Sequence, residues 1–196
     1  MSTPLLPHDA DAGDESQLVQ RLRNGEEAAF DAVYDQYAEA LLRFVARYTS
    51  SPAIAQDVVA DTFAHLWDRR ATLAPRFGLK AYLFAAAQFR MRTTFRHNGR
   101  VRRMLDRFIR EPAGASTDIH VDDVLEIQDI TAQLRHAIAK LPKDRRQLIA
   151  LRWYDGLTVP QIAHVLNLSV GAVEQRLVRI LRELRRHVDA GNLRGS

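Results

Sequence analysis

Residues 158–184 read TVPQIAHVLNLSVGAVEQRLVRILREL, and this stretch determines how the second half of the chain folds. Thr158 is placed to cap a short helix, and Gln161, three residues later, can complete the reciprocal arrangement called a capping box. Residues 167–169, Asn-Leu-Ser, predict a break, with Ser169 as the N-cap of the next helix. The stretch therefore predicts two helices joined by a tight turn, which is a helix-turn-helix.

Each of these two helices is expected to have one apolar and one polar face. Apolar residues at helical spacing predict the buried faces, which are Ile162, Ala163 and Leu166 in the first helix and Val173, Leu177, Ile180, Leu181 and Leu184 in the second. The outer face of the second helix carries Glu174, Gln175, Arg176, Arg179, Arg182 and Arg186. Two helices held at a fixed angle let the second enter a DNA major groove. The alternative is an ordinary helical hairpin in an all-α core.

The composition is that of a globular chain. Its 196 residues are 46% hydrophobic and 27% charged, which is enough for one or two small domains. The absence of cysteine excludes a disulfide framework, a thiolate metal site and a cysteine nucleophile. The N-terminal residues lack the basic start and apolar core of a secretory signal, and no apolar run is long enough to span a bilayer. We expect a cytoplasmic protein with no direct membrane insertion.

The order of helical patterns and charges predicts an all-α chain of two small domains. Residues 1–16 are polar and acidic and contain two prolines, so they are interpreted as a disordered tail. Helical spacing then runs through residues 17–110, with a break near Asn24-Gly25 and a new helix start at Ser51-Pro52. Residues 111–130 carry six acidic residues and no lysine or arginine, which indicates a flexible acidic linker. The second domain, residues 131–190, ends in the helix-turn-helix.

Two more helices are expected at the start of the second domain. The first repeats apolar residues at Leu134, Ile138 and Leu141 and ends at Pro142. The next begins near Lys143 and stops at Asp155-Gly156. Its expected buried residues are Leu148, Ile149, Leu151 and Trp153.

A helix expected from Ala53 to about Arg70 has an acidic side opposite its core side. The core side holds Ile54, Val58, Ala60, Phe63, Leu66 and Trp67, and the opposite stripe holds Asp57, Asp61, His65 and Asp68. Two acids four residues apart repel each other on an isolated helix, so the stripe indicates a basic partner. A solvated face is the alternative. His65 beside Asp61 has no further ligands in register, so neither a metal site nor a cofactor is expected.

Residues 76–110 reverse the sign of the charge. The interval contains one acid, Asp106, and ten basic residues, which are Arg76, Lys80, Arg90, Arg92, Arg96, Arg100, Arg102, Arg103, Arg107 and Arg110. Aromatic residues are interleaved with them. Cations bind phosphates and exposed rings stack on unpaired bases, so the interval is a candidate nucleic-acid surface. Because Tyr82, Leu83 and Ala86 have core spacing, Phe89 and Phe95 are the rings to test for exposure.

This layout resembles bacterial sigma factors of the compact extracytoplasmic-function (ECF) group in the sigma-70 family, from about Leu18 to Val188. Residues 55–63, AQDVVADTF, are similar to the family's acidic segment, with Ala60 where glutamine is usual. The second domain is similar to the promoter −35 reader at Leu141-Pro142, Leu157-Thr158, residues 161–163 and residues 169–173. Two such motif sets in the right order and separation are specific.

The resemblance implies a factor that directs core RNA polymerase to promoters, with no catalytic site of its own. The residues implied to bind core polymerase are Asp57, Asp61, His65 and Asp68. Those implied to hold the −10 element are Lys80, Phe89, Arg90, Arg92, Arg96 and Arg100. Those implied to read the −35 element are Ser169, Val170, Glu174, Gln175, Arg176, Arg179 and Arg182. Family members are commonly held inactive by an anti-sigma factor, which makes such a protein a further expected partner.

The chain departs from its relatives at the expected readers. Many relatives have asparagine and aspartate where this chain has Phe89 and Thr93, and lysine and serine where it has Glu174 and Gln175. Glutamate can accept from cytosine N4 and glutamine can pair with adenine, so an unusual −35 sequence is expected. For Glu174, a solvated charge is the alternative.

Three rival functions remain open at this point. A stand-alone helix-turn-helix regulator leaves the acidic stripe and the arginine-aromatic interval unused. A sigma-like decoy that binds an anti-sigma factor fits the altered Phe89 and Thr93. An enzyme is disfavoured because none of the seven histidines joins an acid, base or nucleophile set.

Overall fold

The computed structural model describes residues 11–49, 51–97 and 134–192, and within these ranges the regular elements are all helices. The chain divides into two compact units, Met1–Thr94 and Phe95–Ser196. The all-α class expected from the sequence is therefore confirmed. Residues 98–133, which include the expected linker, lie outside the described residues.

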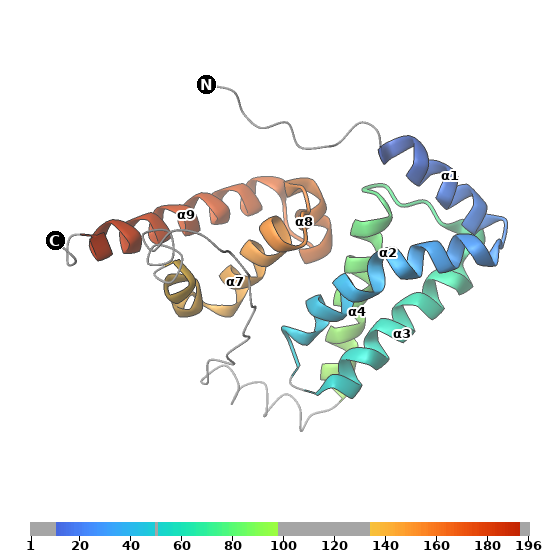
Figure 1. The fold of residues 1–196 in the computed structure, drawn as a ribbon, viewed down its shortest axis with the longest axis horizontal. Coiled ribbons are helices and arrows are strands. Elements are labelled where there is room, and N and C mark those ends of the chain that lie inside the picture. The colour runs from blue at the N-terminus through green and yellow to red at the C-terminus, as the bar shows by residue number, and fades with distance from the viewer. Residues whose placement is uncertain (1–10, 50, 98–133, 193–196) are drawn as a thin grey trace, which may run out of the picture. The chain divides into compact units, whose positions relative to one another are not determined.

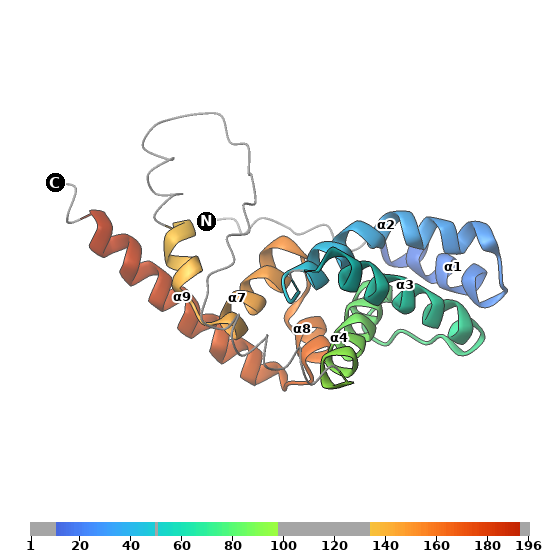
Figure 2. The same cartoon turned by 90° about the horizontal axis from the view of Figure 1, so that it is seen from below.

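The first unit contains α1 (Asp11–Arg23), α2 (Glu27–Ala46), α3 (Pro52–Arg69), the short 3-10 helix η1 (Arg70–Thr72) and α4 (Leu79–His97). Helices α2 and α3 lie side by side, and α4 crosses α2 (Figures 1 and 2). Phe44 of α2 packs on Phe84 of α4 with ring centroids 5.0 Å apart. Both rings are fully buried, so they tie the two helices into one core.

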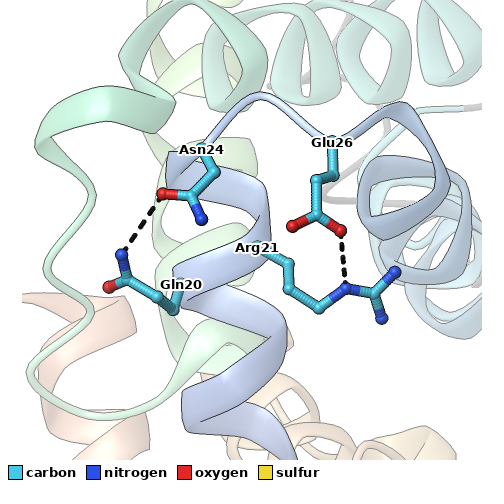
Figure 3. Close-up of polar contacts among 4 residues, drawn as sticks. All are labelled: Gln20, Arg21, Asn24 and Glu26. Carbon is cyan, nitrogen blue, oxygen red and sulfur yellow. Dashed lines mark hydrogen bonds and ion pairs between the residues drawn. The ribbon is translucent and has the colours of Figure 1, made fainter.

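The break expected near Asn24-Gly25 is the turn between α1 and α2 (Figure 3). Gly25 has φ +82, in the left-handed region that favours glycine. Two contacts hold the turn: Gln20 Nε2 donates to Asn24 Oδ1 at 3.3 Å, and Arg21 Nε donates to Glu26 Oε2 at 2.8 Å. Because the second contact is between exposed groups, it contributes little to stability.

Helix α1 corrects the expected tail of residues 1–16. It begins at Asp11, so residues 11–16 are helical rather than disordered, while residues 1–10 lie outside the described residues. The physical reason is a long-range contact, because Glu15 Oε1 accepts a hydrogen bond from Leu79 N–H at 2.6 Å. This contact joins α1 to the first residue of α4. The expectation of a tail rested on the polar composition of residues 1–16, and composition gives no sign of a contact between Glu15 and Leu79.

The second unit contains a helix at residues 134–140, then α7 (Lys143–Ile149), the π-helical turn η2 (Ala150–Tyr154), α8 (Val159–Leu166) and α9 (Val170–Asn192). Helices α7 and α8 both pack against α9 (Figure 1). The largest fully buried side chains of this core are Leu148, Leu151, Leu157 and Ile162. The expected stop at Asp155-Gly156 is confirmed, since η2 ends at Tyr154 and Gly156 has φ +65.

Several residues expected in the cores are on the surface. Ala60 is exposed, Leu166 is only half-buried, and Trp153 and Leu181 have exposed fractions of 52% and 48%. Val165, which the pattern did not assign to the core, is buried beside Ile162 and Ala163.

Candidate nucleic-acid interface and acidic surface

The helix-turn-helix is built from local hydrogen bonds. Thr158 N–H donates to Gln161 Oε1 at 2.8 Å, and Gln161 N–H donates to Thr158 Oγ1 at 3.4 Å, which completes the capping box of α8. Asn167 ends α8 with φ 55, and Ser169 Oγ then accepts from Ala172 N–H at 3.2 Å to cap α9. All the caps expected from the sequence are confirmed. The turn therefore fixes where α9 begins relative to α8.

The outer face of α9 is solvent-exposed over its first four turns. Val173, Leu177, Ile180 and Leu184 are buried against the rest of the unit. Each residue expected to face DNA is exposed, namely Ser169, Val170, Glu174, Gln175, Arg176, Arg179 and Arg182. The structure thus brings these seven residues together on one helix and its N-cap and leaves them accessible to a large partner.

An ion pair joins α9 to α7. Arg145 Nη1 of α7 donates to Glu183 Oε2 of α9, and both side chains are partly buried. Arg152 Nη1 in η2 donates to the carbonyl oxygen of Leu157 at 3.0 Å, just before α8. The first contact joins α7 to α9, and the second joins η2 to the segment before α8.

On the acidic side of α3 the aspartates are exposed, and His65 is less exposed than they are. Asp57, Asp61 and Asp68 are exposed, whereas His65 is half-buried. The pKa of His65 is lowered, mainly by burial and then by the positive charges of Arg90 and Arg69, while Asp68 opposes this shift. The three aspartates form what we call the acidic surface.

Helix α4 carries the expected aromatic and cationic residues in two different environments. Phe89 is 70% exposed, and Arg92 and Thr93, on the same side of the helix, are exposed as well. In contrast, Lys80 and Arg90 are half-buried, and Arg90 Nε makes no hydrogen bond to any residue in the described part of the chain. The side chains of Phe95, Arg96 and Arg100 lie outside the described residues.

Tyr34 is a surface aromatic residue of α2. Its ring is 46% exposed and packs on Phe63 of α3 with centroids 4.7 Å apart. Phe63 lies on the core side of α3, so this contact joins α2 to α3. The exposure of Tyr34 could have been predicted from its residue type, because the hydroxyl group of a tyrosine needs a hydrogen-bond partner such as water.

Comparison with known proteins then identifies the family. Residues 33–101 match the model of sigma-70 region 2, and residues 131–184 match the model of sigma-70 region 4. The RNA polymerase sigma factor CnrH of Cupriavidus metallidurans is 30% identical over 192 residues, covering 94% of this chain and 97% of CnrH. This chain is an ECF sigma factor of the sigma-70 family.

Other relatives agree with this assignment. The ECF RNA polymerase sigma factor BldN of Streptomyces coelicolor is 29% identical over 190 residues, covering 91% of this sigma factor and 67% of BldN. The solved structure of CnrH in complex with the cytosolic domain of CnrY covers 90% of this chain and 97% of that one, with a TM-score of 0.59 and 25% identity. The sigma factor RpoE from Bartonella quintana, solved in complex with the anti-sigma factor NepR, shares the fold over 82% of this chain and 96% of that one, with a TM-score of 0.54 and 24% identity.

The two matched regions coincide with the two described surfaces. The region 2 match begins in α2 and contains the acidic surface and the exposed side of α4, while the region 4 match contains the helix-turn-helix. As a sigma factor, the protein recognises promoters together with RNA polymerase and is not an enzyme.

Among the residues described, no group of three or more histidine, aspartate or glutamate side chains could hold a metal ion. None of the described helices is long and apolar enough to cross a membrane.

Proposed function

We propose that this sigma factor divides promoter recognition among three surfaces: the acidic surface for core polymerase, the exposed side of α4 for the −10 element, and the outer face of α9 for the −35 element. The supporting observation is that α9 exposes six candidate DNA-binding residues, with the seventh, Ser169, as its N-cap, and that an ion pair joins α9 to α7. We also assign residues 11–110 to the first domain, because α1 begins at Asp11, residues 111–130 to the linker and residues 131–190 to the second domain.

The acidic surface is suited to a basic protein partner. Asp57 and Asp61 are one helical turn apart and both exposed, so their mutual repulsion is relieved when a cationic surface covers them. Core polymerase is the partner of every sigma factor, and we assign this surface to it.

The exposed side of α4 is suited to unpaired bases. An exposed ring on Phe89 can stack on a base whatever its identity, and Arg92, one turn further on, can hold the adjoining phosphate. Arg96 and Arg100 extend this cationic stretch in the sequence. The half-buried Arg90 and Lys80 contribute positive potential rather than direct base contacts.

The outer face of α9 is suited to the major groove. The N-terminal residues of a recognition helix contact base edges, and these are Val170, Glu174 and Gln175. Arg176, Arg179 and Arg182 supply phosphate contacts, which position the helix without reading sequence. Glu174 and Gln175 favour cytosine and adenine respectively, which predicts an unusual −35 element.

We further propose that an anti-sigma factor regulates this protein. The support is the RpoE structure, which was solved in complex with the anti-sigma factor NepR and shares the fold. Retrieval of a protein that blocks transcription by this sigma factor from its own host tests this part.

Transcription by core polymerase on a genomic library, with start sites mapped, tests the proposal as a whole. The sigma factor should produce defined start sites that share −10 and −35 elements. Absence of new start sites would favour the decoy alternative. Nanomolar promoter binding by the chain alone in physiological salt would favour the stand-alone regulator.

Charge reversal tests the polymerase surface. The double variant D57K/D61K should lose co-purification with core polymerase. The matched control is D35K, which reverses an exposed acid on α2, and it should bind normally. Equal polymerase binding by both variants would place the polymerase contact elsewhere.

A further inference from the structure

Gly171 is a glycine that the fold itself does not require. It is the second residue of α9, and it is exposed. A Cβ atom built at this position meets nothing within 4 Å. Its φ is not among the positive values, which belong to Gly25, Gly78 and Gly156. Neither space nor backbone conformation within the described unit therefore calls for glycine.

Glycine at this position has a cost to the helix. It loses more backbone entropy on folding than alanine does, so it weakens a helix wherever alanine would fit. The first turn of α9 relies on the hydrogen bond from Ala172 N–H to Ser169 Oγ, which an alanine at 171 would leave in place. The benefit of the missing side chain must then come from outside the unit.

The neighbours of Gly171 indicate where that benefit lies. Glu174 and Gln175 follow it by three and four residues, which makes them its neighbours on the helix surface. Side chains on a helix tilt toward its N-terminus, so both extend over the patch that a side chain at 171 would occupy. Gly171 thus leaves a low point on the outer face, directly beside the two expected base readers.

We propose that Gly171 is a close-approach position of the promoter interface. The absent Cβ lets DNA come close to the backbone of α9, which brings Glu174 and Gln175 within hydrogen-bonding distance of base edges. A methyl group here would hold the helix away from the groove floor. The inference rests on the proposed function, in which α9 reads the −35 element.

The variant Gly171→Ala tests the proposal because it should change stability and DNA binding in opposite directions. The Tm of the full chain should rise by roughly 2–5 °C, since alanine is the better helix former. Holoenzyme binding to a mapped promoter should weaken by about tenfold, the size of one lost base contact. Scrambling the −35 element should then reduce the promoter binding of this variant much less than it reduces the promoter binding of the parent.

Val178→Ala is the matched control. Val178 is also exposed on α9, and its replacement also raises helix propensity, but it removes atoms instead of adding them. It should raise the Tm and keep promoter binding. Loss of binding in both variants would mean that any substitution on the exposed surface of α9 weakens binding, and it would overturn the proposal.

Two further outcomes overturn the inference in distinguishable ways. If the parent binds in a −35-dependent manner and Gly171→Ala binds within twofold of it, Gly171 has no such role while the proposed function stands. If the parent shows no dependence on the −35 element, the proposed role of α9 fails and the inference fails with it. A lower Tm for Gly171→Ala would contradict the open space around this position.

Discussion

The carboxylate of Glu15 on α1 accepts a hydrogen bond from the backbone N–H of Leu79 at 2.6 Å, across 64 residues of sequence. Leu79 is the first residue of α4 and is fully buried. The first N–H groups of a helix lack intrahelical partners, so Glu15 supplies from α1 the cap that α4 needs. The helix that presents Phe89 is therefore anchored by a residue near the N-terminus.

Removing this cap should destabilise the first unit. Glu15→Ala should lower the free energy of unfolding by about 1 kcal/mol, in line with the loss of other helix caps. Glu15→Gln keeps an acceptor oxygen and should retain most of the stability. Chemical denaturation measures both, and Asp14→Ala, an exposed neighbour on α1, is the control. Equal losses for the three variants would mean that the cap contributes nothing.

The N-cap of α9 should contribute a similar amount to the second unit. Ser169→Ala leaves the Ala172 N–H without its acceptor and should cost about 1 kcal/mol of stability. Ser169→Asp restores an acceptor at the same position, so its stability should return to the parent value. Thermal unfolding of the full chain provides the measurement. A Ser169→Asp variant as unstable as Ser169→Ala would show that the side-chain oxygen is not what stabilises α9.

Two substitutions on α9 should separate positioning from reading. Arg179→Ala should weaken holoenzyme binding to all promoters alike and reduce the salt slope by about one unit. Gln175→Ala should cost about 1–3 kcal/mol at one base position and little elsewhere. Binding titrations at several salt concentrations on a set of single-base promoter variants distinguish the two. Arg43→Ala on α2, an exposed arginine paired with Glu39, serves as the control.

The exposed ring of Phe89 should matter for promoter opening rather than for folding. Phe89→Ala should slow open-complex formation by the loss of about 1–3 kcal/mol of stacking, while Phe89→Tyr should keep most of the rate. The helical circular dichroism of both variants should match the parent, because the side chain is 70% exposed. A normal opening rate for Phe89→Ala would remove the stacking role.

His65 should make stability depend on pH. Its pKa is lowered in the folded chain by burial and by Arg90 and Arg69, so the folded state resists protonation more than the unfolded state does. The stability is complete above the unfolded pKa of about 6.5 and falls as the pH drops below it, because only the unfolded state then gains the proton. Denaturation at pH 7.5 and 5.5 should show a smaller difference for His65→Gln than for the parent.

The helix-turn-helix could be predicted because its determinants are local. Thr158 bonds to Gln161, and Ser169 bonds to Ala172, so each cap closes within three residues and the residue types reveal it. The acidic side of α3 could be predicted for the same reason, since helical spacing alone places Asp57 and Asp61 together. The residues expected to read −35 DNA were found at the surface as a group.

The errors arose where a neighbouring helix decides the outcome. Leu181 and Trp153 satisfy the apolar period but lie beyond the reach of the packed elements, so they stay exposed. The lowered pKa of His65, caused by burial and then by Arg90 and Arg69, likewise could not be read from the helical spacing. Periodicity predicts the direction in which a side chain points from its own helix, but it does not predict which neighbouring helix, if any, that side chain packs against.

The amino-acid sequence by itself determined the helices, their caps and the charged faces of α3 and α9. These follow from interactions within one or two turns, whose geometry every α-helix shares. Only the tertiary structure decided that Glu15 caps α4 and that Arg145 pairs with Glu183. Such contacts join residues far apart in sequence, and they form only where the packing of apolar faces brings two helices together.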